Sequence, residues 1–303
     1  LVVEADESDG TFLLLNPVHA VITNIDNDHL DFYGDEESLH LAFEEFANSV
    51  PFYGICALNN HDPEIRNLKQ HMKKPWVSFG IDDEEMDSSP EILAKHLDYG
   101  PRGTSFDLTC FGKSYGRVHI HLPGRHNVLN ALGAISIAHH IGVSAEAMKK
   151  GLDEFYGVGR RLQTLLEKEE FEVIDDYGHH PTEIQVTLET LKRTRPDRRI
   201  VAIFEPHRFS RTRDCWDQFF HCFNYADELY IAPIYPASED PIEGINSSRL
   251  IQDINRLHPR FAKELDSLER LGDLLKDLES EGKTTVAILG AGNIGKKVRE
   301  CLG

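Results

Sequence analysis

The chain has 303 residues, 40% of them hydrophobic, a length and composition that fit two globular domains. Its 51 acidic and 32 basic residues give a net charge of −19 at pH 7. This charge argues against nucleic-acid binding, because a protein that binds the phosphate backbone needs a basic face. No apolar run reaches the ~18 residues of a membrane span. The five cysteines show no metal-binding spacing. We therefore expect a cytoplasmic protein with reduced thiols that binds neither nucleic acid nor membrane.

The first part of the chain, to residue 157, mixes strands with helices. It opens without an initiator methionine inside the apolar segment LVVEA, so we expect a fragment whose N-terminal part is missing. Period-two alternation predicts that its last two strands pair in antiparallel fashion, and Ser144 is the expected N-cap of its last helix. The predicted strands are 1–5, 19–25, 54–60, 75–80, 104–112 and 116–124, and the predicted helices are 38–50, 126–143 and 144–155.

From residue 158 onward, strands and helices alternate regularly. This alternation is typical of a parallel, doubly wound sheet. We therefore predict an α/β protein with domains over 1–157 and 158–303, divided near the glycine-rich segment YGVGRR. The predicted strands are 171–175, 199–204, 228–234 and 284–290, and the predicted helices are 182–193, 214–223, 247–257 and 267–279.

A GxGxxG motif, formed by Gly290, Gly292 and Gly295, follows the last predicted strand and matches the dinucleotide-binding pattern. Only eight residues follow Gly295, too few for the second strand and the acidic residue that a dinucleotide site needs. A strand-to-helix turn of this kind also allows close packing or binds an anion. We predict such a turn, and keep a nicotinamide-dependent oxidoreductase as an alternative.

Titratable side chains gather where two predicted strands of the second part end. DDYGHHPTE begins at residue 175, and EPHRFSRTRD begins at residue 205. The carboxyl edge of an open α/β sheet faces the ligand crevice, and three arginines within six residues suit a carboxylate or a phosphate. The two segments predict an anion-binding site. A polar loop with a helix cap and a solvated charged face are the alternatives.

Acidic side chains follow two predicted strands of the first part. EADESDG covers residues 4–10, and NIDNDH covers residues 24–29. Carboxylates with one imidazole suit Mg²⁺ or Mn²⁺, and Mg²⁺ commonly bridges to phosphates. The sequence therefore predicts a divalent-metal site here, with metal-free acidic loops as the alternative.

Seven motifs in the chain resemble those of the Mur ligases, ATP-dependent enzymes of peptidoglycan synthesis, and occur in that family's order. The family has a UDP-binding domain, a central ATPase domain and a C-terminal Rossmann-like domain. The resemblance implies that residues 1–157 are the latter part of the central domain and 158–303 the C-terminal one. The phosphate-binding loop GxxxxGK[ST] and the UDP-binding domain, which would belong to the same chain, are absent, so we expect this fragment to be inactive alone. The motifs are EADESD, TNIDNDHLD, LPGRHNVLNALGA, GVGRR, DDYGHHPTE, PHRFSRTRD and GAGNIG.

The segment PHRFSRTR looks most like the branch of the family that joins L-alanine to UDP-N-acetylmuramate. The resemblance implies that the substrate carboxylate attacks the γ-phosphate of ATP, and that the amine of L-alanine then attacks the resulting acyl phosphate. Because phosphoryl transfer depends on positioning and charge neutralisation, Mg²⁺ and arginines would carry most of the protein's part. A murein tripeptide-recycling ligase and a non-catalytic ligand-binding module are the alternatives.

The resemblance also implies roles for individual residues. Glu4 and His29 would coordinate Mg²⁺, although spacing alone does not separate Glu4 from the other acidic residues of EADESD. Near the adenine would lie His126, Asn127 and Asn130, of which both asparagines could instead be ordinary helix-start residues. The ATP ribose and phosphates would be held by Arg160 with Asp175 or Asp176.

The remaining implied roles concern the substrates. Catalytic roles would fall to His179, Arg208 and Arg211, with His179 as the candidate acceptor of the amine proton. The residues that would position the carboxylate substrates and L-alanine are Tyr177, His179, His207, Arg208 and Arg211.

Overall fold

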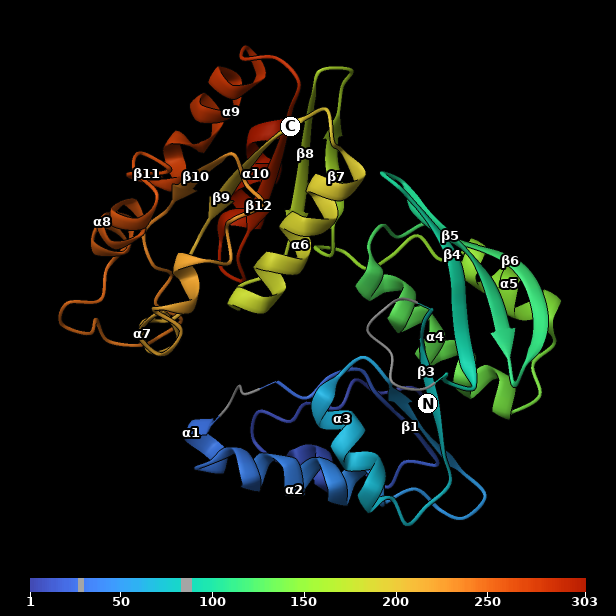
Figure 1. Ribbon diagram of the computed structural model, residues 1–303. Coiled ribbons are helices and arrows are strands. Elements are labelled where there is room, and N and C mark those ends of the chain that lie inside the picture. The colour runs from blue at the N-terminus through green and yellow to red at the C-terminus, as the bar shows by residue number, and fades with distance from the viewer. Residues whose placement is uncertain (27–29, 83–88) are drawn as a thin grey trace. The chain divides into compact units, whose positions relative to one another are not determined.

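Two six-stranded, mainly parallel sheets organise the chain, one in each half. The computed structural model describes residues 1–26, 30–82 and 89–303, and the chain divides into two units, Leu1–Tyr156 and Gly157–Gly303 (Figure 1). Helices flank both sheets, which confirms the predicted α/β class. Among the described residues, no helix is both long and apolar enough to cross a membrane.

In the first unit the strand order is β1-β2-β3-β4-β5-β6. The first four strands are parallel, and β5 and β6 extend the sheet in antiparallel fashion. Phe106 pairs with Val118, which confirms the antiparallel pairing predicted for these two segments. The strands are β1 His19–Ile22, β2 Ile55–Asn59, β3 Trp76–Ile81, β4 Ile92–Gly100, β5 Gly103–Cys110 and β6 Lys113–Ile120.

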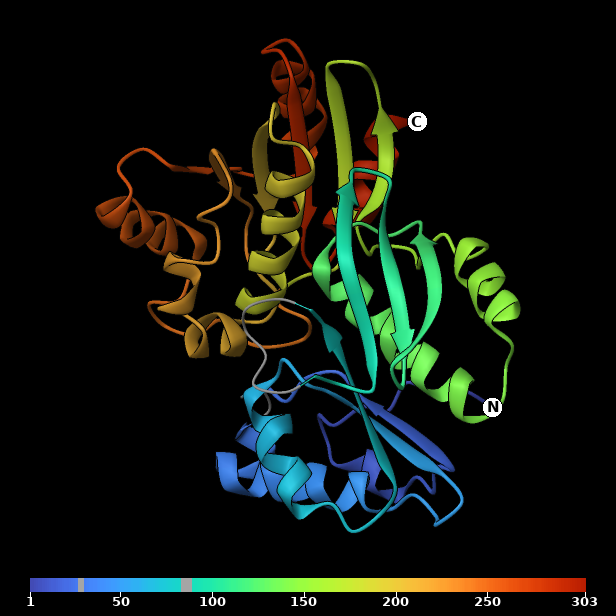
Figure 2. The same ribbon diagram turned by 45° about the vertical axis from the view of Figure 1, so that its right-hand side comes forward.

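Both faces of this sheet are covered, as the two ribbon views show (Figures 1 and 2). Side chains alternate along a strand, so Ile55 and Ala57 of β2 pack with α4, whereas Cys56 and Leu58 pack with α2 and α3. The helices are η1 Thr11–Leu14, α1 Leu30–Tyr33, α2 Glu36–Ala47, α3 Pro63–Leu68, η2 Lys69–His71, α4 Arg125–His140 and α5 Ala145–Asp153.

Of two local predictions for the first unit, one is confirmed and one is wrong. The Ser144 hydroxyl accepts a hydrogen bond from the Ala147 N–H at 3.2 Å, which confirms the predicted cap of α5. The strand predicted over 1–5 is wrong, because this segment joins no ladder and Leu1 and Val2 are exposed. An apolar, β-branched run does not form a strand without a partner for its N–H and C=O groups.

The second unit has the strand order β11-β10-β9-β12-β8-β7, in which every neighbouring pair is parallel except β7 with β8. Helices α6 and α8 pack on one face, and α9 and α10 on the other, so the predicted doubly wound sheet is confirmed. The strands are β7 Gln163–Glu167, β8 Phe171–Asp176, β9 Arg199–Phe204, β10 Glu228–Ile231, β11 Ala262–Glu264 and β12 Thr284–Leu289. The helices are α6 Pro181–Thr194, α7 Phe209–Asp214, η3 Gln218–Phe220, α8 Ser247–Leu257, η4 Leu268–Arg270, α9 Leu271–Glu279 and α10 Ile294–Leu302.

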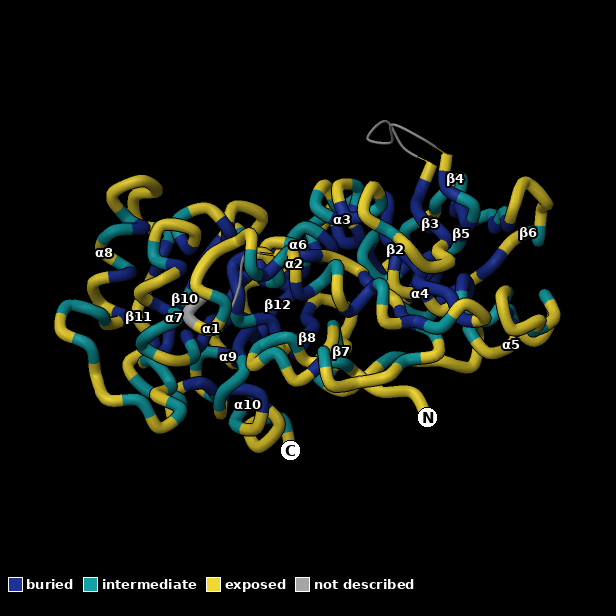
Figure 3. The backbone as a smooth tube through the Cα atoms, turned by 90° about the horizontal axis from the view of Figure 1, so that it is seen from below, coloured by how far each residue is buried: buried dark blue, intermediate teal, exposed yellow. Residues whose placement is uncertain are grey.

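The centre of the second sheet is buried along its whole length, and Figure 3 colours β12 and β8 accordingly. One predicted helix, over 214–223, is wrong, because α7 ends at Asp214 and η3 follows. The side chains of Phe219, Cys222 and Phe223 are nevertheless buried. The spacing of these apolar residues therefore indicated that they are buried in the core. Turns can bury such side chains as well as a helix can.

Candidate functional site

Three polar segments meet at the carboxyl edge of the second unit's sheet. Leu289, the last residue of β12, pairs with Asp176 of β8 on one side and with Phe204 of β9 on the other. The segments DDYGHHPTE, EPHRFSRTRD and GAGNIG begin at the ends of these three strands. Pairing between parallel strands therefore brings together segments that are far apart in the sequence, at the edge where open α/β sheets bind ligands.

Asp175 is fully buried at this edge and faces two arginines. Its Oδ2 accepts a hydrogen bond from Nη2 of Arg299 at 2.5 Å and lies 3.6 Å from Nε of Arg160. Its Oδ1 is buried and has no hydrogen-bond partner in the described part of the chain. Burial raises the pKa of Asp175 above its ordinary value, against the lowering effect of Arg160 and Arg299. Asp175 is thus charge-paired on one oxygen, and its other oxygen is buried without a partner among the described residues.

Asp176 points to the opposite face of β8 and is used internally. Its Oδ2 accepts a hydrogen bond from the Leu162 N–H at 2.8 Å. Its Oδ1 accepts from the Gly178 N–H at 2.9 Å and from the Thr187 hydroxyl at 3.2 Å. Burial raises the pKa of Asp176 above its ordinary value, and these hydrogen bonds lower it. The carboxylate fixes the turn between β8 and α6, so both of its oxygens are used inside the unit, whereas Oδ1 of Asp175 is not.

Arg160 is held by three groups besides Asp175. Its Nη2 donates a hydrogen bond to the carbonyl oxygen of Gly290, and its guanidinium carbon lies 4.7 Å from the centroid of the Tyr177 ring. A Cβ built on Gly295 would lie 2.8 Å from Nε of Arg160, so the missing side chain makes room for the guanidinium. Contacts from the end of β8, the turn after β12 and the start of α10 thus define the position of Arg160.

The ring of His179 lies between those of Tyr177 and His207, with centroid distances of 5.5 and 5.8 Å. Its Nδ1 is 3.1 Å from the carbonyl oxygen of Tyr177 and 3.6 Å from Oε2 of Glu183. Glu183 also accepts hydrogen bonds from the N–H groups of His179 and His180, at 3.0 and 3.2 Å. Burial lowers the pKa of His179, and Glu183 opposes that effect. The imidazole is therefore neutral near pH 7 and able to accept a proton.

His207 is also neutral at pH 7. Its ring stacks on that of Tyr235 with a centroid distance of 5.4 Å and an interplanar angle of 17°. Burial, followed by the proximity of His179 and Arg211, lowers the pKa of His207 to about 4. Its buried Nδ1 has no hydrogen-bond partner within the described ranges.

The three arginines of PHRFSRTR are not equivalent. Arg208 is exposed and has a left-handed backbone, with φ of 70°, and its N–H donates to the carbonyl oxygen of Tyr235 at 2.8 Å. Such a conformation costs roughly 1 kcal/mol in a non-glycine residue and is commonly retained at functional sites. Arg211 is half-buried beside the histidines, whereas Arg213 is exposed and pairs with Asp214 at 2.7 Å. Arg208 and Arg211 thus belong to the site, and Arg213 to the surface.

The glycine-rich turn before α10 is occupied by a side chain of the protein itself. Glu205 is buried, and its Oε2 accepts a hydrogen bond from the Ile294 N–H at 2.9 Å. A carboxylate already takes the N–H groups that a pyrophosphate would need, which argues against a dinucleotide at this turn. Sequence reasoning missed Glu205, Tyr235 and Arg299. Of these, only Glu205 lay inside a segment that the pattern had singled out.

In the first unit, the carboxyl ends of the strands are tied to α4. His61 accepts a hydrogen bond at Nε2 from the Ile81 N–H at 2.9 Å, and its Nδ1 lies 2.7 Å from Nη2 of Arg125. The residues predicted to lie near the adenine follow directly in α4. His126 and Asn127 are half-buried and Asn130 is exposed. Asn127 donates to the Pro123 carbonyl oxygen at 2.8 Å, a bond that fits the alternative of a helix-start residue.

Of the two predicted metal ligands, the structure describes only Glu4. Glu4 is exposed in the segment that precedes η1, and His29 lies outside the described residues. The nearby Asp9 already accepts hydrogen bonds from the N–H and hydroxyl of Thr11, at 3.0 and 2.6 Å. Among the described residues, no group of three or more His, Cys, Asp or Glu side chains could hold a metal ion. The metal site on Glu4 and His29 stays a prediction.

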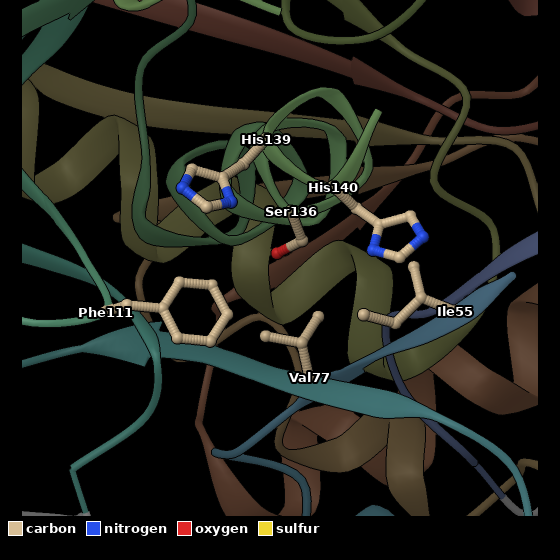
Figure 4. A pocket seen from close by; sticks show the side chains of 6 residues that line it. All are labelled: Ile55, Val77, Phe111, Ser136, His139 and His140. Carbon is tan, nitrogen blue, oxygen red and sulfur yellow. The ribbon is translucent and has the colours of Figure 1, made fainter. Parts of the chain in front are cut away.

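A shallow pocket lies at the other edge of the first sheet (Figure 4). Ile55 and Val77 stand at the amino ends of β2 and β3, and His139 and His140 at the C-terminal end of α4. Since ligands of such sheets bind beyond the carboxyl ends, this pocket is separate from the candidate site. Its lining residues are Ile55, Val77, Phe111, Ser136, His139 and His140.

Comparison with known proteins matches both units to one family. The description "Mur ligase middle domain" matches residues 2–138, and "Mur ligase, glutamate ligase domain" matches residues 160–292. The UDP-N-acetylmuramate–L-alanine ligase of Geobacter sulfurreducens is 43% identical over 295 residues, which cover 97% of this chain and 63% of that protein. The enzyme of the same name from Solidesulfovibrio magneticus is 41% identical over 288 residues, 92% of this chain and 62% of that protein.

The fold is shared with a solved structure of the same kind of enzyme. UDP-N-acetylmuramate-alanine ligase MurC from Thermotoga maritima matches with a TM-score of 0.77 and 26% identity, over 98% of this chain and 62% of that one. This chain therefore spans slightly less than two thirds of the length of these relatives. Because the two family matches cover nearly the whole chain in the order middle domain, then C-terminal domain, the chain belongs to the Mur ligase family.

Proposed function

We propose that this chain is the middle and C-terminal part of an ATP-dependent ligase that joins L-alanine to UDP-N-acetylmuramate through an acyl phosphate. The curated relatives, at 41 to 43% identity, carry that name. The observation that carries the proposal is the gathering of Arg160, Asp175, His179 and Arg208 at one sheet edge. We place the reaction in the cytoplasm, where ATP and reduced thiols occur.

Arg160 and Asp175 are proposed to hold ATP, which supplies the phosphoryl group when bound. The guanidinium of Arg160 is fixed by the Gly290 carbonyl and the Tyr177 ring, so it can neutralise phosphate charge with little loss of side-chain entropy. The unpartnered Oδ1 of Asp175 would accept a ribose hydroxyl. Asp176 would support the turn beside them. The adenine would be contacted by His126, Asn127 and Asn130.

Glu4 and His29 are proposed to hold Mg²⁺, which reduces the repulsion between the phosphates and an attacking carboxylate. The carboxylate of Glu4 is exposed, and a hard oxygen ligand of this kind suits Mg²⁺ or Mn²⁺.

The substrate acids are proposed to bind Arg208 and Arg211, with Tyr177 and His207 beside them. Two guanidinium groups stabilise the negative charge that develops on the acyl phosphate and on the tetrahedral adduct. L-Alanine attacks through its neutral amine, so a proton must leave its ammonium group. His179 is neutral near pH 7 and lies within ring contact of both Tyr177 and His207, which supports it as the acceptor of that proton.

The test is phosphate release by the complete protein that contains this chain. Release should require Mg²⁺, UDP-N-acetylmuramate and L-alanine together. Arg208→Ala should abolish it without changing the fold measured by circular dichroism. Release that needs a murein tripeptide instead of L-alanine would favour the recycling ligase, and release with no amino-acid requirement would refute the proposal.

A further inference from the structure

Glu205 joins both ends of the glycine-rich turn between β12 and α10. It follows β9 directly, and only 3% of its surface is exposed. Its N–H donates a hydrogen bond to the carbonyl oxygen of Leu289 at 2.9 Å, and its Oε2 accepts one from the Ile294 N–H at 2.9 Å. Leu289 is the last residue of the strand and Ile294 the first of the helix. One residue just beyond the end of a neighbouring strand therefore holds the turn at its entry and its exit.

The first two glycines of the motif accommodate this residue. Gly290 has φ of +141°, and a Cβ there would lie 2.7 Å from the Glu205 carbonyl oxygen. A Cβ on Gly292 would run into the Glu205 carboxylate and would lie 2.8 Å from Cγ of Tyr235. A glycine is required at these positions because only glycine lets another group approach the backbone so closely. The turn is thus shaped around Glu205.

The same turn supports Arg160 on its other side. The carbonyl oxygen of Gly290 accepts the hydrogen bond from Nη2 of Arg160, and the bare Cα of Gly295 lies against the guanidinium. The direction of the Gly290 carbonyl depends on the conformation of the turn, and Glu205 sets that conformation. The chain of contacts runs from Glu205, through the turn, to the guanidinium of Arg160.

We propose that Glu205 is a positioning residue that fixes Arg160 for the phosphates of ATP. This inference rests on the proposed function, in which Arg160 binds ATP. The Glu205 carboxylate is also attracted by the charge of Arg160. The role nevertheless needs an acceptor of the right length more than a charge, because an amide oxygen could accept the same hydrogen bond from Ile294. Glutamine should therefore replace Glu205, whereas alanine should not.

The experiment measures KM for ATP, KM for L-alanine and kcat in the complete protein. Glu205→Ala should raise KM for ATP by about tenfold, the loss expected when one charge-assisted contact is misplaced, and should leave KM for L-alanine unchanged. Glu205→Gln should stay within about twofold of the unaltered protein. In an Arg160→Ala background, Glu205→Ala should have no further effect on KM for ATP, because both changes act on one interaction.

Glu228→Ala is the matched control. Glu228 is also a buried carboxylate of this sheet, at the start of β10, and it pairs with Lys263 away from the turn. Its loss should lower the thermal midpoint without changing KM for ATP. A rise in KM for ATP in this control, or an unchanged effect of Glu205→Ala in the Arg160→Ala background, would overturn the inference. If Glu205→Ala does not fold, Glu205→Asp, which is too short to reach Ile294, takes its place.

Failure of the proposed function is a distinct result. If the unaltered complete protein releases no phosphate with L-alanine, that function is wrong, and a crystal structure of Glu205→Ala then decides the positioning role. Arg160 should leave the Gly290 carbonyl oxygen in that variant. An unmoved guanidinium would refute the positioning role.

Discussion

Arg160 lies over the ring of Tyr177, with its guanidinium carbon 4.7 Å from the ring centroid. The two residues are also joined through the backbone, because the Tyr177 N–H donates to the Arg160 carbonyl oxygen at 2.7 Å. Arg161 approaches the same ring at 5.7 Å. A cation over a partly exposed ring gains roughly 0.5–1 kcal/mol, so the ring helps to hold the arginine that we propose meets ATP.

This arrangement predicts different outcomes for two substitutions of Tyr177. Tyr177→Phe keeps the ring face and should leave KM for ATP unchanged. Tyr177→Ala removes the face and should raise KM for ATP by about two- to fivefold, as expected for a loss of roughly 0.5–1 kcal/mol. Steady-state kinetics at saturating L-alanine measure both. A raised KM for ATP in Tyr177→Phe would mean that the hydroxyl, and not the ring, acts on the nucleotide.

The arginines of PHRFSRTR should separate into two classes. Arg208→Ala and Arg211→Ala should each lower kcat/KM by about 100-fold or more. Each removes a positive charge that would stabilise the negative charge developing on the acyl phosphate and the tetrahedral adduct. Arg213 is exposed and pairs with its neighbour Asp214, so Arg213→Ala should change kcat/KM by about twofold at most. The three variants carry the same change in net charge, which makes Arg213→Ala the control. Equal losses in all three would point to long-range electrostatics in place of direct contact.

His207 should make stability depend on pH in acid. Its folded pKa of about 4 lies below the ordinary histidine value of 6.5, so between these values the unfolded chain binds a proton that the folded chain does not. The stability that neutral His207 contributes is therefore present above pH 6.5 and is lost as the pH falls towards 4. His207→Gln should weaken this dependence. Urea midpoints at several pH values between 4 and 7 test it, and parallel curves for the two proteins would contradict it.

Two glycine-to-alanine changes should have opposite signs. Gly292→Ala places a Cβ against the Glu205 carboxylate and the Tyr235 ring and should destabilise the fold by about 1–3 kcal/mol. Gly151 lies in α5 with open space around its Cα, so Gly151→Ala should stabilise by about 0.5–1 kcal/mol. Urea unfolding of both variants gives the comparison. A neutral Gly292→Ala would show that the turn is not packed as described.

Much of the second unit could be predicted from the sequence. The helix over 247–257 and the strand over 199–204 have the predicted bounds, and the alternation of elements correctly indicated a doubly wound sheet. These elements carry strong local signals, because buried strands are continuously apolar and amphipathic helices repeat every 3.6 residues. The two failures have different causes. In 1–5 the apolar residues Leu1 and Val2 are exposed and join no ladder, whereas in 214–223 the apolar residues are buried but the backbone forms turns.

The sequence by itself determined the family, the fold class, the two titratable segments at the sheet edge and the glycine-rich turn, since motif order and periodicity are properties of the chain alone. Only the tertiary structure decided which partners the side chains of those segments have. Asp175 and Asp176 are adjacent, yet one faces Arg299 and the other Leu162 and Thr187. Alternation along β8 directs the two carboxylates to opposite faces of the sheet. Their partners lie on other elements, which only the packing of the unit brings next to β8. The role of Glu205 has the same origin, because its contacts are on β12 and α10, more than 80 residues away.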